Sequence, residues 1–226
     1  KTMKIKQFKS IEQLENSLVT DIVKIITDSI ENYGDARILL SGGSTPINLY
    51  STLSQQNINW SKVKIGLVDE RFVNNDSDFS NEKLIRKNLL KNYAKDALFF
   101  EMVYSTDNEK LNLELVNDKY SSFMKRLDLT ILGMGSDGHT ASIFPNDLES
   151  ERIMNTKNIG IYSTKAPKFP FNRITCSKEI IGNSNDIFLF ITGKTKFNIF
   201  KNSIKTNVPI SYFIKEYENM ETYYTE

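Results

Sequence analysis

Hydrophobic residues gather in four short runs along the chain, and each run ends in small or polar residues. The runs read ARILLS, VKIGLVD, DLTILGMG and DIFLFITG, and they cover residues 36–41, 63–69, 128–135 and 186–193. Almost continuous apolar runs of this length are typical of strands that are covered on both faces, as in parallel sheets. They therefore predict the core strands of a largely parallel sheet.

Helical patterns lie between these runs. Helices are expected over residues 81–91 and 196–204, and another is expected directly after Pro46. Two longer stripes of apolar residues repeat at helical spacing. They consist of Ile11, Leu14, Leu18, Ile22, Ile25 and Ile26, and of Leu111, Leu115, Tyr120, Phe123 and Met124.

Strands that alternate with helices predict an α/β fold, namely a three-layer α/β/α sandwich with a mostly parallel, Rossmann-like sheet. No linker, repeat or low-complexity tract interrupts residues 1–226, so we expect a single domain. Ligands of open parallel sheets bind beyond the carboxyl ends of the strands, where the strand order reverses. The loops that follow the four runs are therefore the first places to search for a site.

The first of these loops, residues 41–46, reads SGGSTP. Gly42 and Gly43 allow the main chain to approach a ligand closely. Thr45 is expected to cap the next helix, and Pro46 suits its first turn. Free N–H groups and the positive end of the helix dipole favour a phosphate at such a loop. An ordinary capped turn is the alternative interpretation.

The second loop begins DERF and places Asp69, Glu70 and Arg71 side by side. The rigid guanidinium fork of Arg71 can grip an anionic group. Asp69 or Glu70 can accept hydrogen bonds from sugar hydroxyls or hold Arg71 in place. A solvated cluster of surface charges is the alternative.

The third loop contains His139, the only histidine of the chain. Gly133, Gly135 and Gly138 permit a tight main-chain path, and the following TASIF is expected to be helical. Histidine ordinarily changes charge between pH 5 and 8, and Asp137, two residues earlier, can fix its tautomer. We interpret the pair as an acid–base catalyst, although a histidine that merely caps a turn has the same local sequence.

Other catalytic chemistries have little support. The G-x-S-x-G elbow of serine hydrolases is absent. One histidine and no H-E-x-x-H motif leave no recognisable metal site, so we expect no metal. Cys176 is the only cysteine, which excludes an internal disulfide and suits a reducing compartment; we expect it to be a small buried apolar residue.

Charge narrows the range of partners. Lysine and arginine total 29 and aspartate and glutamate total 28, so nothing favours binding to nucleic acid or to an anionic membrane. No apolar stretch approaches the ~20 residues that span a bilayer, and residues 1–10 lack a signal-peptide core, so we expect a cytoplasmic protein. Positive charge is expected only locally, from Arg71, from Arg173 in PFNRIT, and from Lys194 or Lys196 in TGKTK.

The order of these motifs resembles that of the 6-phosphogluconolactonases, a family within the glucosamine-6-phosphate deaminase superfamily. The resemblance extends from about residue 37 to residue 196 and rests on LSGGSTP, VDERFV with Ser80 and Asn81, LGMGSDGHTASIFP, NRIT and the G-x-x-K that ends at Lys196. It implies hydrolysis of 6-phospho-D-glucono-1,5-lactone to 6-phosphogluconate in the oxidative pentose phosphate pathway, without a metal or organic cofactor. It also implies a small phosphorylated sugar lactone as ligand; we expect a monomer or a weak homo-oligomer.

The resemblance assigns roles to individual residues. His139 matches the catalytic histidine and Asp137 its acidic neighbour. Asn74 stands where the family commonly has proline. The substrate-binding set that we expect, with the division of charges between phosphate and lactone left open, comprises Gly42, Gly43, Ser44, Thr45, Asp69, Arg71, Arg173 and Lys196.

Two other functions compete with lactone hydrolysis. Deaminases of the superfamily typically continue from DGH into an asparagine–glutamate–proline segment and carry tyrosine in place of Arg71, whereas this chain has SIFP. A non-catalytic sugar-phosphate sensor is the second alternative. Such proteins usually carry an added DNA-binding segment, which we do not expect here.

Overall fold

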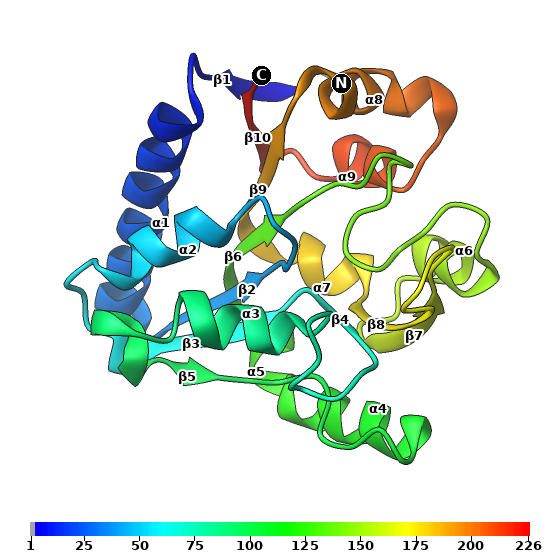
Figure 1. Ribbon diagram of the computed structural model, residues 1–226, viewed down its shortest axis with the longest axis horizontal. Coiled ribbons are helices and arrows are strands. Elements are labelled where there is room, and N and C mark those ends of the chain that lie inside the picture. The colour runs from blue at the N-terminus through cyan, green and yellow to red at the C-terminus, as the bar shows by residue number, and fades with distance from the viewer. Residues whose placement is uncertain (1–2) are drawn as a thin grey trace.

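The computed structural model of the protein describes residues 3–226. Its main sheet has the order β1-β10-β9-β6-β2-β3-β5, and all neighbouring strands are parallel (Figure 1). The four predicted apolar runs supply the central strands. The strands are β1 (Lys4–Gln7), β2 (Ala36–Leu40), β3 (Val63–Leu67), β5 (Leu98–Phe99), β6 (Leu127–Leu132), β9 (Ser184–Thr192) and β10 (Met220–Thr225).

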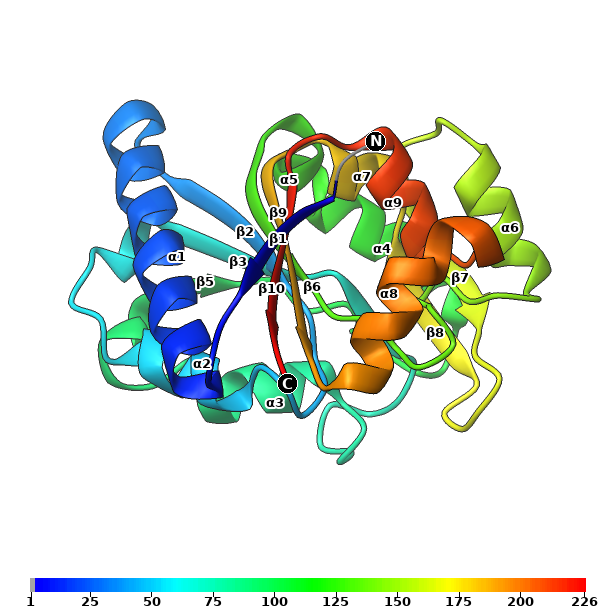
Figure 2. The same ribbon diagram turned by 90° about the horizontal axis from the view of Figure 1, so that it is seen from above.

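Helices cover both faces of this sheet, which confirms the predicted α/β/α architecture. Figure 2 shows α1 on one face and α8 and α9 on the other. The helices are α1 (Ile11–Tyr33), α2 (Ile47–Ser54), α3 (Asn81–Asn88), α4 (Glu109–Lys119), α5 (Ser121–Lys125), α6 (Leu148–Asn155), α7 (Lys178–Gly182), α8 (Lys194–Thr206) and α9 (Ile210–Glu216), with 3₁₀ turns at Trp60–Lys62 and Asn92–Asp96. No helix in residues 3–226 is both long and apolar enough to cross a membrane.

The longest helix, α1, follows its sequence signals closely. The hydroxyl of Ser10 accepts the N–H of Gln13 at 3.2 Å, and Gly34 ends the helix in the left-handed conformation. The buried side of α1 includes most of the predicted stripe and packs on β2, β6 and β10. Ile11 is an exception, because it lies in the first turn and is exposed.

The second predicted stripe is wrong in part. α4 ends at Lys119 and α5 begins at Ser121, so the apolar spacing does not continue along one helix. Tyr120 and Phe123 are fully buried, but Leu111 and Leu115 are exposed. Cys176 is fully buried, as predicted, and burial raises the pKa of its thiol.

A small antiparallel sheet, which the hydrophobic pattern does not reveal, lies beside the main one. It consists of β4 (Asp69–Arg71), β8 (Asn172–Cys176) and β7 (Ile161–Lys165), in the order β4-β8-β7. The second apolar run therefore divides: β3 ends at Leu67, and the chain enters the second sheet at Asp69. In this sheet Arg71 of β4 and Arg173 of β8 lie directly opposite each other in the strand register.

The strand order reverses between β2 and β6. From β2 the chain continues to β3 on one side, whereas β6 lies on the other side and is followed by β9 and β10. The loops after β2 and β6 therefore diverge, which creates a crevice at the carboxyl edge of the sheet. The C-terminal segment inserts as β10 between β1 and β9.

Glu70 anchors the start of α3 beneath this edge. Its buried carboxylate accepts the N–H groups of Arg71 and Asn81 at 2.8 Å and that of Glu82 at 2.9 Å. Burial, opposed by these hydrogen bonds, raises the pKa of Glu70 to about 7. Of the two carboxylates in DERF, Glu70 thus holds the scaffold together, while Asp69 faces the crevice.

This arrangement predicts a pH-dependent effect of Glu70→Gln. The folded chain binds the Glu70 proton more tightly than the unfolded chain, where the ordinary pKa is 4.5. The unfolding free energy of the native protein should therefore fall relative to that of the variant as the pH rises from 4.5 to 7. The expected fall is ~3 kcal/mol, since a tenfold change in proton affinity corresponds to ~1.4 kcal/mol. Urea titrations of both proteins across this range measure the difference; a constant or rising difference would contradict the account.

Candidate active site

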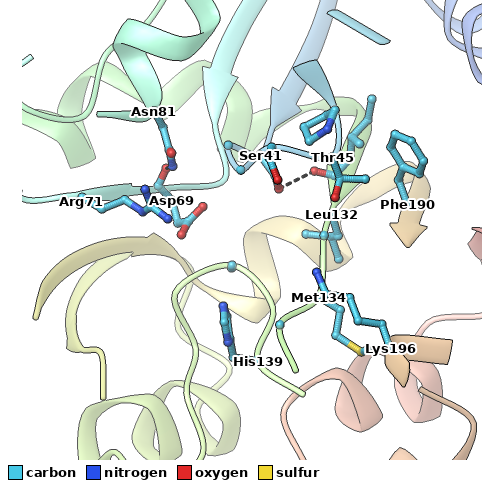
Figure 3. A pocket seen from close by; sticks show the side chains of 18 of the residues that line it. Ser41, Thr45, Asp69, Arg71, Asn81, Leu132, Met134, His139, Phe190 and Lys196 are labelled. Carbon is cyan, nitrogen blue, oxygen red and sulfur yellow. Dashed lines mark hydrogen bonds between the residues drawn. The ribbon is translucent and has the colours of Figure 1, made fainter. Parts of the chain in front are cut away.

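A cavity of about 270 Å³ opens at the crevice between β2 and β6 (Figure 3). Its walls come from the loops after β2 and β6, from β4 and β8, and from the first turns of α3 and α8. The expected binding residues all line it together with the histidine: Gly42, Gly43, Ser44, Thr45, Asp69, Arg71, His139, Arg173 and Lys196. Asp137 lies behind His139 and lines a neighbouring cavity instead.

The ring of His139 is held by Asp137. Its Nδ1 lies 2.5 Å from Oδ1 of Asp137, and that oxygen also accepts the main-chain N–H of His139 at 3.0 Å. Partial burial raises the pKa of Asp137, but the hydrogen bonds from His139 outweigh burial, and the pKa lies below its usual range. A neutral imidazole that donates from Nδ1 keeps its acceptor lone pair on Nε2. Figure 3 shows the ring pointing into the cavity.

The glycines of this loop make room for the ring. The N–H of Gly135 donates to the carbonyl of His139 at 2.9 Å, which closes the loop. A Cβ at Gly135 would stand 2.1 Å from Cε1 of His139. Gly138 has φ +82°, and a Cβ there would meet Val208. Both glycines are therefore required by the fold of the loop.

The predicted helix at TASIF is wrong. Residues 140–144 form an isolated bridge between Thr140 and Ile143, with Ala141 at φ 53°, a left-handed conformation that interrupts a helix. The segment is tied down elsewhere instead. The Ser142 hydroxyl donates to Oδ2 of Asp69 at 2.5 Å, and Phe144 packs against the His139 ring at 4.7 Å between centroids.

Two arginines concentrate positive charge at the cavity. Arg71 donates to the carbonyl of Phe79 at 2.9 Å, and Nε of Arg173 donates to that of Pro170 at 2.7 Å. Arg173 is only 8% exposed, and burial, followed by repulsion from Arg71, lowers its pKa. Within residues 3–226 neither guanidinium forms an ion pair with a carboxylate. A buried guanidinium without a counter-ion favours an anionic ligand.

The structure separates the two candidate lysines. Lys196 lines the cavity, whereas Lys194 pairs with Glu226 at 3.2 Å, Nζ to Oε2. This placement agrees with the choice of Lys196 from the resemblance.

The glycine loop after β2 differs from its prediction in one detail. Pro46, not Thr45, occupies the N-cap position of α2, and no side chain caps this helix, because the chain is still turning at Thr45. Gly43 has φ +89°, which favours glycine there. The main-chain N–H groups of residues 43–45 find no acceptor within the described part of the chain. They remain available to a bound anion.

Asn81 and Phe190 also line the cavity and had not been assigned to the site. Asn81 stands beside Ser80 in one of the motifs on which the resemblance rests, which is a weak indication of a role in the site. Phe190 has no such indication, since its sequence shows only that it belongs to an apolar strand. Among the residues that the structure describes, no group of three or more histidine, cysteine, aspartate or glutamate side chains is arranged to hold a metal ion.

Comparison with known proteins extends the resemblance over nearly the whole chain. A curated 6-phosphogluconolactonase of Helicobacter pylori is 33% identical over 205 residues, which are 91% of this chain and 88% of the relative. One from Rhizobium meliloti is 33% identical over 84% of this chain and 82% of the relative. The crystal structure of a 6-phosphogluconolactonase from Shewanella baltica has a TM-score of 0.94 and 32% identity, with 100% of this chain and 99% of that chain covered.

The family profile gives the same result. The family described as glucosamine-6-phosphate isomerases/6-phosphogluconolactonase matches residues 9–223, a span that includes β2 to β9, most of β10 and every motif of the cavity. The chain therefore belongs to the glucosamine-6-phosphate isomerase/6-phosphogluconolactonase family.

Proposed function

We propose that this protein hydrolyses 6-phospho-D-glucono-1,5-lactone to 6-phosphogluconate, with His139 as the general base and acid. One observation carries the proposal. A histidine oriented by a carboxylate lies on the wall of the same cavity as two arginines that lack a carboxylate partner in residues 3–226. The names of the curated relatives support this substrate.

The geometry supports a simple proton relay. With Nδ1 directed at Asp137, Nε2 of neutral His139 removes a proton from water as the water oxygen attacks the lactone carbonyl. The carboxylate of Asp137 stabilises the imidazolium that results. His139 then gives the proton to the ring oxygen as the C–O bond breaks. A free main-chain N–H of a glycine loop, or one of the basic side chains, stabilises the oxyanion.

The basic residues hold the substrate for this step. In Figure 3, Arg71 and Lys196 lie on opposite sides of the cavity, and His139 lies between them in the view, below Arg71. A phosphate bound by such donors fixes the sugar ring against the base. Binding energy gained at the phosphate thus offsets the entropic cost of orienting the lactone carbonyl toward the base.

The deaminase alternative fits this cavity less well. The group packed on the His139 ring, apart from Asp137, is the apolar Phe144, and no carboxylate stands at the SIFP segment. Asp69 is a second acid on the cavity wall, only 7% exposed, but its Oδ2 is already engaged by Ser142. We therefore assign Asp69 to substrate binding.

Lactone turnover tests the function directly. The purified protein should acidify a weakly buffered solution of fresh lactone faster than the spontaneous rate, and His139→Asn should lower kcat by ~10²–10⁴-fold. Binding of 6-phosphogluconate, measured by calorimetry, should be largely retained in the variant. An unchanged kcat would reject the role of His139. Ammonia release from glucosamine 6-phosphate would favour the deaminase, and binding without any turnover would favour a sensor.

A comparison of variants at Lys196 and Lys194 tests the binding pocket. Lys196→Ala should raise KM for the phosphorylated lactone about 10- to 100-fold, because a charge-assisted hydrogen bond contributes ~1.5–3 kcal/mol. Arg71→Ala should act in the same way. Lys194→Ala is the matched control, since Lys194 pairs with Glu226, and its KM should not change. If wild-type protein treated phosphorylated and unphosphorylated lactones equally, the pocket assignment would be wrong.

Gly135→Ala tests the position of the ring. The new methyl group would stand 2.1 Å from Cε1 of His139, so the imidazole must move away from its present place. We expect kcat to fall by at least ~10-fold, since small displacements of a catalytic group are costly. Calorimetric binding of 6-phosphogluconate should be largely retained. Equal kcat values for the variant and the native protein would show that the ring position is not critical.

A further inference from the structure

Asn81, the first residue of α3, has a side chain whose orientation is locked. It is 2% exposed, and its main-chain N–H donates to Glu70 at 2.8 Å. Its Nδ2 donates to the main-chain carbonyl of Asp69 at 2.9 Å. With the amide nitrogen engaged in this way, Oδ1 must face the other direction. Figure 3 shows the side chain reaching from α3 toward Asp69 and Arg71.

The oxygen Oδ1 of Asn81 lies against Gly42. A Cβ at Gly42 would stand only 1.9 Å from this oxygen, so the bare Cα of glycine leaves the space that Oδ1 occupies. Both residues line the cavity. No donor within residues 3–226 reaches Oδ1. Oδ1 is not one of the fully buried side-chain atoms that lack a partner, so part of its surface is open, and because Asn81 lines the cavity, a bound ligand can donate a hydrogen bond to it.

The chemistry of the acceptor selects its partner. An amide oxygen accepts hydrogen bonds, so it cannot bind a phosphate oxygen or a lactone carbonyl, which are acceptors themselves. The donors of the cavity, Arg71, Arg173 and Lys196, suit those anionic or carbonyl oxygens. Asn81 and Asp69 form an acceptor wall, and the donors that a phosphorylated sugar lactone offers to such a wall are its ring hydroxyls.

We propose that Asn81 is a specificity-determining residue, whose Oδ1 accepts a hydrogen bond from one ring hydroxyl of the sugar lactone. Gly42 is needed so that this oxygen can reach the cavity. The proposal rests on the proposed function, because it assigns a further contact in the same site. It explains why a buried amide stands between a phosphate loop and a carboxylate.

A cycle of enzyme and substrate changes tests this contact. The native protein and Asn81→Ala are assayed with the parent lactone and with three analogues that lack the hydroxyl at carbon 2, 3 or 4. The native protein should lose about 10- to 100-fold in kcat/KM on one analogue, since the deletion leaves a buried acceptor unpaired. Asn81→Ala should show a loss of similar size on the parent and should no longer distinguish the parent from that analogue.

Two further variants complete the experiment. Gly42→Ala displaces Oδ1 and should abolish the same discrimination, so the proposal can be tested even if Asn81→Ala does not fold. Asn88→Ala is the matched control, because Asn88 lies in the same helix and its amide donates to the carbonyl of Leu84, its only side-chain hydrogen bond within residues 3–226. Its discrimination should equal that of the native protein.

The outcomes separate this contact from the activity itself. If Asn81→Ala and Gly42→Ala discriminate every analogue as the native protein does, Asn81 is structural only and the proposal is overturned. If the native protein does not turn over the parent lactone, the proposed function fails. The same cycle is then measured as calorimetric binding of 6-phosphogluconate and its deoxy analogues, and an absence of coupling there would overturn the contact as well.

Discussion

The pairing of Arg71 with Arg173 across β4 and β8 is the constraint on which the site depends. Burial, followed by repulsion from Arg71, lowers the pKa of Arg173, and no carboxylate within residues 3–226 forms an ion pair with either guanidinium. In the proposed function, an anionic ligand would relieve this repulsion, so the charge that the fold places here is also the proposed basis of recognition.

The rest of the cavity is arranged around that charge. The loop after β2 adds main-chain N–H groups that have no acceptor in the described part of the chain, and α8 adds Lys196. His139 enters from the loop after β6, on the other side of the strand-order reversal. Neighbouring carboxylates have different tasks: Asp137 orients the imidazole, and Glu70 anchors α3. The chemistry is thus distributed over segments far apart in the sequence, which the parallel sheet brings to one edge.

Sequence reasoning succeeded where one signal dominated. The central strands are nearly continuous apolar runs, and the rule for ligands of parallel sheets located the loops that line the cavity. It failed where tertiary contacts decide. The second sheet is built from short strands whose pattern is not hydrophobic, and Ala141 takes a left-handed conformation that its sequence does not reveal. The position of Asn81 depends on the carbonyl of Asp69 and the missing side chain of Gly42, which only the folded chain brings together.

A structure of the protein with bound 6-phosphogluconate would show whether the cavity holds the sugar phosphate against His139. We expect the product to lie in the cavity at the β2–β6 crevice, with its phosphate in contact with at least one of Arg71, Arg173 and Lys196. Its new carboxylate should lie within hydrogen-bond distance of Nε2 of His139, about 3 Å. A product bound outside this cavity, or one whose carboxylate points away from His139, would contradict the account.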